Sequence, residues 1–574
     1  MNMLAILLVA VVQPLWPSID RMPLYQDHQA AAPSQEEKAE GFDRAAHRMP
    51  YLEWSEKPAN PNGACVILIS GGGYSSTCDG PAFKPLERKM LDNGITCVWL
   101  WYRTPRPKGQ PIYMTGWIDG QRAVRLVRAA AKERGFDPER IGVLGCSAGS
   151  HLSVMLATSS QTPAYEKVDA TDDLPCHINW AIPMCPAYAL TDGLTGANSR
   201  DGDAPDVKLN PSFAFDAKTC PMCFFHGGRD QYSPNGSTQL YRQLRRMKIP
   251  AELHLDPDRG HGPVNAAKFE RAIEFMRQMG FLGPLQPKEN LYDRFADDSA
   301  RSEYEKEFIW PEGEIPNVQT NQCVPYIEWH MPKELKTKAI QIIYSGGGYT
   351  GNGPSSFEVT PARRYLNEKG MTVVTMKYRT PRPLPESGLQ KHVTAWQDLQ
   401  RAIRIVRSKA AAKGLDPNRI GIMGSSAGGH LTLMGATSSR HNTARGNWWT
   451  AEGLDTIPCN VQWAVAIYPA YALTDGEDAY NTTGGNDDSA RLVPEFSFDL
   501  DTCPILFIHG DADGWASMNS VKCWEQLRRM GIQGELHTLA LRPHCFQKSA
   551  IPGTGSYTWL DRIWEFMTFK GYNR

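Results

Sequence analysis

Hydrophobic and polar positions along the chain predict a parallel β-sheet with crossover helices. Short apolar runs, rich in β-branched and aromatic residues, alternate with longer amphipathic stretches. Strands buried on both faces have this continuous apolar pattern. Helical spacing predicts a helix over Ile118–Gly135, which a Gly-Phe-Asp-Pro sequence ends. In the first half the predicted strands are Cys65–Ile69, Ile95–Trp101, Ile141–Leu144, Ile178–Met184, Met222–Phe225 and Glu252–Leu255.

The same pattern occurs a second time, in the same order. The blocks that recur are Ser70–Tyr74 as Ser345–Tyr349, Tyr102–Pro107 as Tyr378–Pro383, and Pro186–Gly193 as Pro469–Gly476. Internal repetition on this scale indicates a tandem duplication. We therefore predict two domains, residues 15–285 and 286–574, with the junction in the polar stretch around Pro284–Arg301.

Charge and composition exclude some classes of function. The chain of 574 residues has 61 Lys and Arg against 62 Asp and Glu, a net charge of −1. Nucleic-acid binders usually carry a basic excess, so no nucleic-acid partner is expected. The apolar run Met3–Val12 is too short to span a bilayer and has the length of a signal-peptide core. Residues 1–14 are thus predicted to be a signal peptide of a secreted or periplasmic protein without stable membrane insertion; a buried N-terminal segment is the alternative, since no Lys or Arg precedes the run.

A Gly-x-Ser-x-Gly sequence lies between a predicted strand and a predicted helix in both halves. The two matches are Gly145–Gly149 and Gly424–Gly428. A serine in such a tight turn stands at the carboxyl end of the sheet, and the glycines leave room for neighbouring backbone. We therefore predict Ser147 and Ser426 as nucleophiles.

A serine nucleophile needs a base and an orienting acid, expected in the order Ser, Asp, His. Asp230 and His261 follow Ser147, and Asp513 and His544 follow Ser426, with 31 residues from acid to histidine in each half. These four residues are the predicted acids and bases. The alternative acids are Asp511 in the second half, and Asp192 and Asp475 after an earlier strand. His151 and His430, four residues after the serines, are expected to pack inside a helix.

Each half also has a glycine-rich loop after its first strong strand, Ser70–Tyr74 and Ser345–Tyr349. Glycines let backbone amides approach a substrate closely, as an oxyanion hole requires. A phosphate-binding loop is the rival interpretation, but neither nucleotide-binding glycine pattern follows. The predicted oxyanion-hole amides belong to Gly72, Gly73, Ala148, Gly347, Gly348 and Ala427.

Together these motifs resemble the α/β-hydrolase esterases of the acetyl-xylan esterase and feruloyl-esterase-like group. The cues are Gly-Gly-Gly-Tyr, Tyr-Arg-Thr-Pro-Arg-Pro, Asp-Pro-x-Arg-Ile-Gly, Ser-Ala-Gly-x-His and His-Gly-x-x-Asp, present in each half. The resemblance implies two tandem α/β-hydrolase domains, each a mostly parallel sheet flanked by helices, and no metal or organic cofactor. Family members often carry a Glu after the glycine loop; Glu358 offers it in the second half, whereas Lys84 stands in the first.

We therefore expect a carbohydrate esterase that removes acetyl or other small acyl groups from an acylated polysaccharide or oligosaccharide, with a Ser-His-Asp site in each half. The alternatives are a general carboxylesterase or feruloyl esterase, or a chain in which one half is an inactive binding scaffold. Trp180 and Trp463 lie inside predicted strands and are expected in the core. Cys220 and Cys223 have CxxC spacing, but the second half lacks the second Cys, so buried strand cysteines are the favoured interpretation.

Overall fold

The computed structural model describes residues 20–25, 50–77, 82–106, 109–194, 196–197, 204, 206–290, 304–351, 353–441, 453–476 and 490–574. The predicted signal peptide, residues 1–14, lies outside these residues. Within the described ranges, no helix has the length and apolar character needed to cross a membrane.

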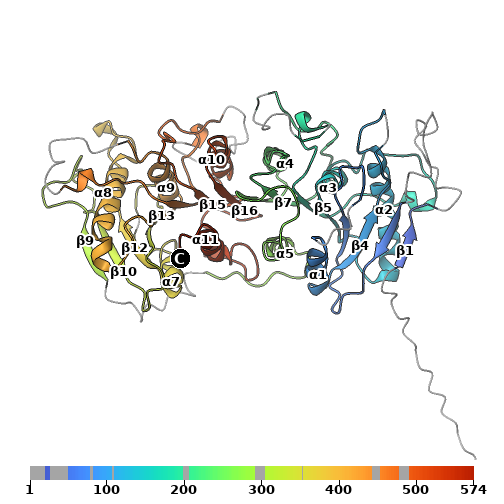
Figure 1. The fold of residues 1–574 in the computed structure, drawn as a ribbon, viewed down its shortest axis with the longest axis horizontal. Coiled ribbons are helices and arrows are strands. Elements are labelled where there is room, and N and C mark those ends of the chain that lie inside the picture. Colours follow the sequence, from blue (N-terminus) through green and yellow to red (C-terminus); the bar gives the residue numbers. More distant parts are fainter. Residues whose placement is uncertain are drawn as a thin grey trace, which may run out of the picture.

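Within the described residues, each half contributes eight strands and five α-helices in the same order (Figure 1). In the first half the strands are β1 (Asp20–Pro23), β2 (Tyr51–Trp54), β3 (Cys65–Ile69), β4 (Thr96–Trp101), β5 (Ile141–Cys146), β6 (Trp180–Met184), β7 (Met222–Gly227) and β8 (Ala251–Asp256), with helices α1 (Lys84–Asp92), α2 (Met114–Arg134), α3 (Ala148–Thr158), α4 (Asn235–Arg246) and α5 (Glu270–Gln278). In the second half the strands are β9 (Glu305–Phe308), β10 (Tyr326–His330), β11 (Ile340–Tyr344), β12 (Thr372–Lys377), β13 (Ile420–Ser425), β14 (Trp463–Ile467), β15 (Ile505–Gly510) and β16 (Gly534–Leu539), with helices α7 (Thr360–Glu368), α8 (Val393–Ala410), α9 (Ala427–Thr437), α10 (Met518–Arg529) and α11 (Trp559–Phe569).

The predicted parallel sheet is confirmed in both halves. Strands β4, β3, β5, β6, β7 and β8 are neighbours in that order and run parallel. Helices lie on both faces of the sheet (Figure 1), which explains why the central strands are buried along their whole length. Trp180 and Trp463 are fully buried in strands, as expected. The pattern did not predict the short antiparallel strands β1 and β2, because neither is buried on both faces.

The two halves share one sheet. Strand β8 pairs antiparallel with β16, so the sixteen strands form a single sheet whose order mirrors itself about this junction (Figure 1). Leu255 pairs with Leu536 and His254 with His537 at its centre. One hydrophobic cluster contains core residues of both halves, including Leu253 and Leu536. The halves are therefore packed as one body around an internal pseudo-twofold axis.

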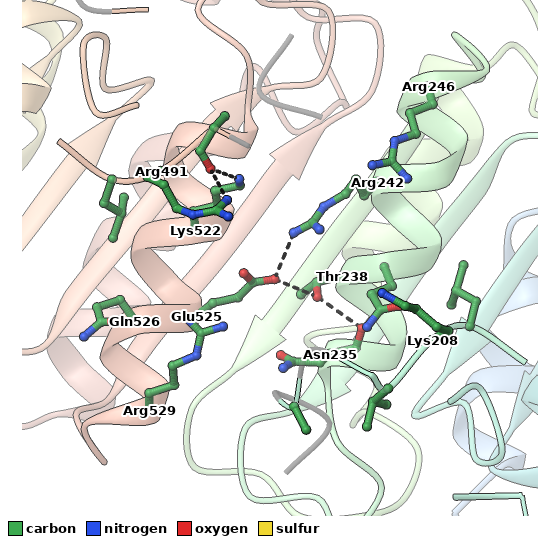
Figure 2. A pocket seen from close by; sticks show the side chains of 16 residues that line it. Lys208, Asn235, Thr238, Arg242, Arg246, Arg491, Lys522, Glu525, Gln526 and Arg529 are labelled. Carbon is green, nitrogen blue, oxygen red and sulfur yellow. Dashed lines mark hydrogen bonds and ion pairs between the residues drawn. The ribbon is translucent and has the colours of Figure 1, made fainter. Parts of the chain in front are cut away.

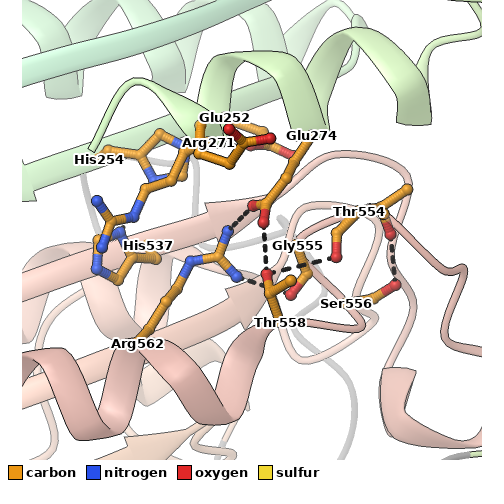
Figure 3. A network of polar contacts seen from close by, with 12 residues as sticks. Glu252, His254, Arg271, Glu274, His537, Thr554, Gly555, Ser556, Thr558 and Arg562 are labelled. Carbon is orange, nitrogen blue, oxygen red and sulfur yellow. Dashed lines mark hydrogen bonds and ion pairs between the residues drawn. The ribbon is translucent and has the colours of Figure 1, made fainter. Parts of the chain in front are cut away.

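Charged side chains join the halves on one face of the sheet. Arg562 of α11 donates a hydrogen bond to Glu274 of α5 over 2.5 Å, and the Thr558 hydroxyl donates to the same carboxylate over 2.7 Å (Figure 3). The symmetry-related pair, Arg271 and Glu565, lies 2.6 Å apart. Burial distinguishes the two pairs, because the side chain of Glu274 is 7% exposed and that of Glu565 is 59% exposed.

On the other face, α4 and α10 line a groove of about 710 Å³ between the halves (Figure 2). Thr238 of α4 donates a hydrogen bond to Glu525 of α10 over 3.0 Å, and Arg242 lies 3.6 Å from the same carboxylate. Both helical layers thus contribute polar contacts to the junction.

Candidate active sites

The two predicted nucleophiles occupy strained turns. Ser147 has φ 58° and ψ −121°, and Ser426 has φ 57° and ψ −121°, each directly before the first residue of a helix. Few non-glycine residues adopt a positive φ, and such strain concentrates at functional sites. The turn lifts each serine hydroxyl out of the end of its strand and toward the loops that follow the neighbouring strands.

The glycines of these turns are required by close backbone packing. A Cβ at Gly145 would lie 2.3 Å from the Gly149 carbonyl oxygen, and one at Gly149 would lie 2.2 Å from the Ile69 carbonyl oxygen. In the second half, a Cβ at Gly424 would lie 2.4 Å from the Gly428 carbonyl oxygen. Side chains at these positions would push α3 or α9 away from the sheet.

In the first half, the predicted serine, histidine and acid form one hydrogen-bonded chain. His261 Nε2 lies 2.7 Å from the Ser147 hydroxyl oxygen. His261 Nδ1 lies 2.8 and 2.9 Å from the two carboxylate oxygens of Asp230. The structure therefore brings together side chains that are 114 and 31 residues apart in the sequence.

The second half repeats this arrangement. His544 Nε2 lies 2.8 Å from the Ser426 hydroxyl oxygen, and His544 Nδ1 lies 2.7 Å from Asp513 Oδ2. The acid is held by its own loop, because the backbone amide of Trp515 donates to Asp513 Oδ1 over 2.8 Å. Both sites thus have the geometry of a nucleophile, a base and an orienting acid.

Each acid is kept ionised by two histidines. Burial raises the pKa of Asp230, but hydrogen bonds from His226 and His261 outweigh it and hold this pKa well below its ordinary value. Burial lowers the pKa of His261, whereas the Asp230 carboxylate raises it, and the net shift is upward. The pKa of Asp513 is lowered for the same reason, by His509 and His544 acting against burial. A buried, ionised acid in this position would stabilise an imidazolium if the neighbouring histidine took up a proton.

Sequence reasoning missed the second histidine at each acid. His226 Nε2 lies 3.2 Å from Asp230 Oδ2, and His509 Nε2 lies 3.3 Å from Asp513 Oδ2. Each also contacts the helix that follows, through Ser237 Oγ or Ser520 Oγ at 2.8 Å. The signal was available, because each histidine opens the His-Gly-x-x-Asp motif that located the acid.

The glycine loops lie against the nucleophiles. A Cβ at Gly71 would lie 3.0 Å from Ser147 Cβ, and one at Gly346 would lie 2.7 Å from Ser426 Cβ. In the second half, Gly347 and Gly348 line a pocket of about 380 Å³ together with Ser426. His544, Tyr471 and Trp515 line the same pocket, so the predicted oxyanion loop faces the nucleophile and its base.

Glu358 anchors this loop in the second half. Its carboxylate accepts hydrogen bonds from the Gly346 amide over 2.7 Å and from the Tyr468 hydroxyl over 3.1 Å. Sequence comparison had placed Lys84 opposite Glu358, but Lys84 is the first residue of α1 and pairs with Glu87 on that helix. Helix α7 begins at Thr360, so the helix register instead places Ala82 opposite Glu358.

The sites also differ behind the histidine. In the first half Cys185 Sγ lies within 4.8 Å of His261 and 3.3 Å from the Sγ of Cys146, the residue before Ser147. In the second half the corresponding residue is Tyr468, whose ring lies edge-on against His544 with centroids 4.7 Å apart. The two halves therefore present different surroundings to their bases.

The alternative residues have other contacts. Asp511 accepts hydrogen bonds from Tyr241 and Arg245 at the junction between the halves. Asp192 and Asp475 lie in short 3₁₀ turns, while both histidine bases bond to the predicted acids.

The helix histidines and the CxxC cysteines are buried. His151 bonds to Tyr74 and Asn210, and His430 bonds to Tyr349. Cys220 and Cys223 are both free thiols.

Comparison with known proteins gives a match in each half. The family model described as BD-FAE matches residues 54–244 and 327–526, together more than half of the chain. Acetylxylan esterase of Xylanibacter ruminicola is 35% identical over 236 residues, which cover 39% of this chain and 46% of that protein. Esterase LipQ of Mycobacterium tuberculosis is 29% identical over 195 residues, 32% of this chain and 45% of that protein. The match thus spans about half the length of these curated relatives.

Among solved structures, the acetyl ester-xyloside bifunctional hydrolase from Caldicellulosiruptor lactoaceticus is similar with a TM-score of 0.38 and 23% identity. That alignment covers 47% of this chain and 97% of the other.

Proposed function

The chain belongs to the BD-FAE family in both halves, and we propose on this basis that it is a carboxylic ester hydrolase with two serine active sites. The membership in an α/β-hydrolase esterase group expected from the sequence is confirmed by this match and by the esterases among the relatives. The observation that carries the proposal is the pair of hydrogen-bonded Ser-His-Asp chains, each beginning at a serine with positive φ.

In the proposed mechanism, Ser147 or Ser426 attacks the ester carbonyl while His261 or His544 takes the hydroxyl proton through Nε2. The histidine returns this proton to the departing alcohol, which leaves an acyl-enzyme. A water molecule, activated by the same histidine, then releases the carboxylate. Asp230 or Asp513 holds Nδ1–H throughout.

The developing negative charge would be stabilised by backbone amides. In the first half these are the amides of Gly72, Gly73 and Ala148, and in the second half those of Gly347, Gly348 and Ala427. Loss of one such donor typically slows a serine hydrolase by about 10²–10³-fold. The glycine loop that faces Ser426 in the pocket supports this assignment for the second half.

We further propose that the substrate is an acetylated or otherwise acylated polysaccharide, and that the protein acts outside the cytoplasm. The similarity to an acetylxylan esterase supports this substrate class. The second pocket, of about 380 Å³ and lined by Tyr471 and Trp515, has aromatic surfaces that suit a sugar ring next to a small acyl group.

The test is acetate release from acetylated xylan by wild type, Ser147→Ala, Ser426→Ala and the double variant. We expect partial loss in each single variant and none left in the double variant. Hydrolysis of 4-nitrophenyl acetate without release from xylan would contradict the polysaccharide substrate but keep the esterase. Loss in only one single variant would show that the other half is inactive or takes another ester, and no hydrolysis of either substrate would refute the proposed activity.

A further inference from the structure

Three side chains of the kinds that bind transition metals converge in the second half. His392 precedes α8 as its cap, His430 lies on α9, and Glu495 belongs to the segment before β15. The Glu495 Oε1 atom lies 3.6 Å from His430 Nε2 and 3.8 Å from His392 Nδ1. All three ligand atoms lie within 4.8 Å of one another. We call these residues the His-His-Glu cluster.

The distances from the Glu495 oxygen to the two histidine nitrogens are too long for hydrogen bonds, but they suit an ion bound between these atoms. Hydrogen bonds to nitrogen rarely exceed about 3.2 Å. His392 Nδ1 and His430 Nε2 have no hydrogen-bond partner among the described residues, although both side chains are buried. Buried polar atoms are nearly always satisfied. In a tetrahedral zinc site with bonds of about 2.0–2.1 Å, ligand atoms stand about 3.3 Å apart, close to the 3.6 and 3.8 Å between Glu495 and the two histidines.

The first half shows what the same position looks like without this cluster. There, His151 Nε2 lies 3.1 Å from the side-chain amide nitrogen of Asn210. Asn210 is fixed in orientation, because its amide also donates to the Tyr188 carbonyl and its oxygen accepts from the Ser212 amide. His151 Nε2 must therefore be an acceptor, which leaves the proton on Nδ1, facing the Tyr74 hydroxyl at 2.9 Å.

The second half keeps this histidine and tyrosine but changes the three residues around Nε2. His430 Nδ1 lies 2.9 Å from the Tyr349 hydroxyl, as in the first half, and Phe496 contacts His430 as Phe213 contacts His151. The changes are Tyr113 to His392, Asn210 to Val493 and Ser212 to Glu495. Together they remove the donor to Nε2 and supply two new ligands.

We propose that His392 Nδ1, His430 Nε2 and the Glu495 carboxylate bind one divalent transition-metal ion of the zinc type, with a fourth position for water. Two imidazoles and one carboxylate form a known zinc ligand set. The hydrogen bond from His430 Nδ1–H to Tyr349 would orient the ring, as partners of metal-bound histidines do. The ion would tie α8, α9 and the Glu495 segment together beneath the Gly346–Tyr349 loop, without taking part in the proposed ester chemistry.

The test compares zinc binding by the full chain and by a variant that restores the residues of the first half, His392→Tyr, Val493→Asn and Glu495→Ser. This combination already occurs in the same fold, so it is expected to fold, and circular dichroism checks this. After chelator treatment and removal of the chelator, each protein is dialysed against Zn²⁺ and its bound zinc counted by mass spectrometry. We expect wild type to bind one more equivalent of zinc than the variant. Zinc should raise the melting temperature of wild type and leave that of the variant unchanged.

Two controls separate this site from others. Cys185→Ser removes a thiol that lies near Asp230 and His261 in the first half. This variant should still bind the zinc equivalent that the triple variant no longer binds. Cobalt bound to wild type should show four-coordinate visible bands without thiolate charge-transfer bands. Equal zinc content in wild type and the triple variant, or loss of the equivalent in Cys185→Ser, would overturn the proposal. Neither readout depends on esterase activity.

Discussion

Replacing the acid of one junction ion pair should destabilise the protein far more than the same replacement in its symmetry mate. Glu274 pairs with Arg562, and Glu565 pairs with Arg271; residues 562 and 565 each stand 291 positions after their counterparts 271 and 274. The perturbation is Glu274→Gln against Glu565→Gln, which changes charge but not shape. The two pairs differ in exposure, and Glu274 also accepts a hydrogen bond from Thr558, so the Glu565 variant serves as the exposed control.

The expected magnitudes follow from burial. In the first pair, Arg562 and Glu274 are 3% and 7% exposed, so losing the carboxylate leaves a guanidinium in the junction without its counterion. Removing one partner of a buried pair costs about 3–5 kcal/mol, and Gln retains one acceptor, so we expect about 3 kcal/mol. Glu565 is 59% exposed, and breaking such a pair costs about 0–1 kcal/mol.

The assay is urea unfolding of both variants and wild type, followed by tryptophan fluorescence. Glu274→Gln should shift the midpoint strongly at an unchanged slope, and Glu565→Gln should barely shift it. A double variant Glu274→Leu with Arg562→Met should recover much of the loss, because it removes both charges. Equal shifts for the two Gln variants, or no shift for Glu274→Gln, would refute the reasoning that this junction is buried and that its charges are coupled.

Three further predictions concern the junction and the second active site. Burial raises the pKa of Glu252 to about 8, so the folded protein holds a proton there that the unfolded chain has already lost at neutral pH. As the pH rises from about 6.5 to about 8 this proton is lost, and its contribution to the free energy of unfolding should fall by about 2 kcal/mol. Glu252→Gln should make the fall in denaturation curves smaller, while the part due to Glu535, whose pKa burial raises to about 7, remains. Gly424→Ala forces a Cβ to within 2.4 Å of a carbonyl oxygen, so in a Ser147→Ala background ester hydrolysis should drop about 10²-fold, while Gly424→Ala alone should leave the first site working. Glu358→Gln weakens the charged acceptor of the Gly346 amide, so in the same background we expect about tenfold lower kcat/KM, and an unchanged value would contradict the anchoring role.

Much of each candidate site could be predicted from the sequence because its parts are local. Gly145 is required by contact with Gly149 within one strand, turn and helix, and Gly149 by contact with Ile69 of the adjacent strand, so the glycine motif indicates the turn. The acid and histidine were found because parallel strands bring their carboxyl ends to one edge. The second histidine at each acid, His226 or His509, was overlooked although it lies in the same motif.

Several differences between the two halves could be recognised only in the structure. Glu358 aligned with Lys84 by sequence, but the helix register showed otherwise. The His-His-Glu cluster joins residues that are 38 and 65 positions apart, and no spacing in the sequence marks them as neighbours. Only the folded chain brings them together, with the His392 and His430 rings 5.3 Å apart and the Glu495 carboxylate facing both.

The sequence by itself determined the duplication, the parallel sheet and the two serine turns, because each depends on hydrophobic period and on sterics within a few residues. Tertiary structure decided that the two halves share one sheet. The pairing of β8 with β16 uses backbone groups that every strand edge offers, between residues about 280 positions apart, so no residue pattern distinguishes it from an exposed edge. Glu252, Glu274 and Arg562 are buried because of that pairing. The effect of their charges on stability therefore follows from the tertiary structure and not from the sequence.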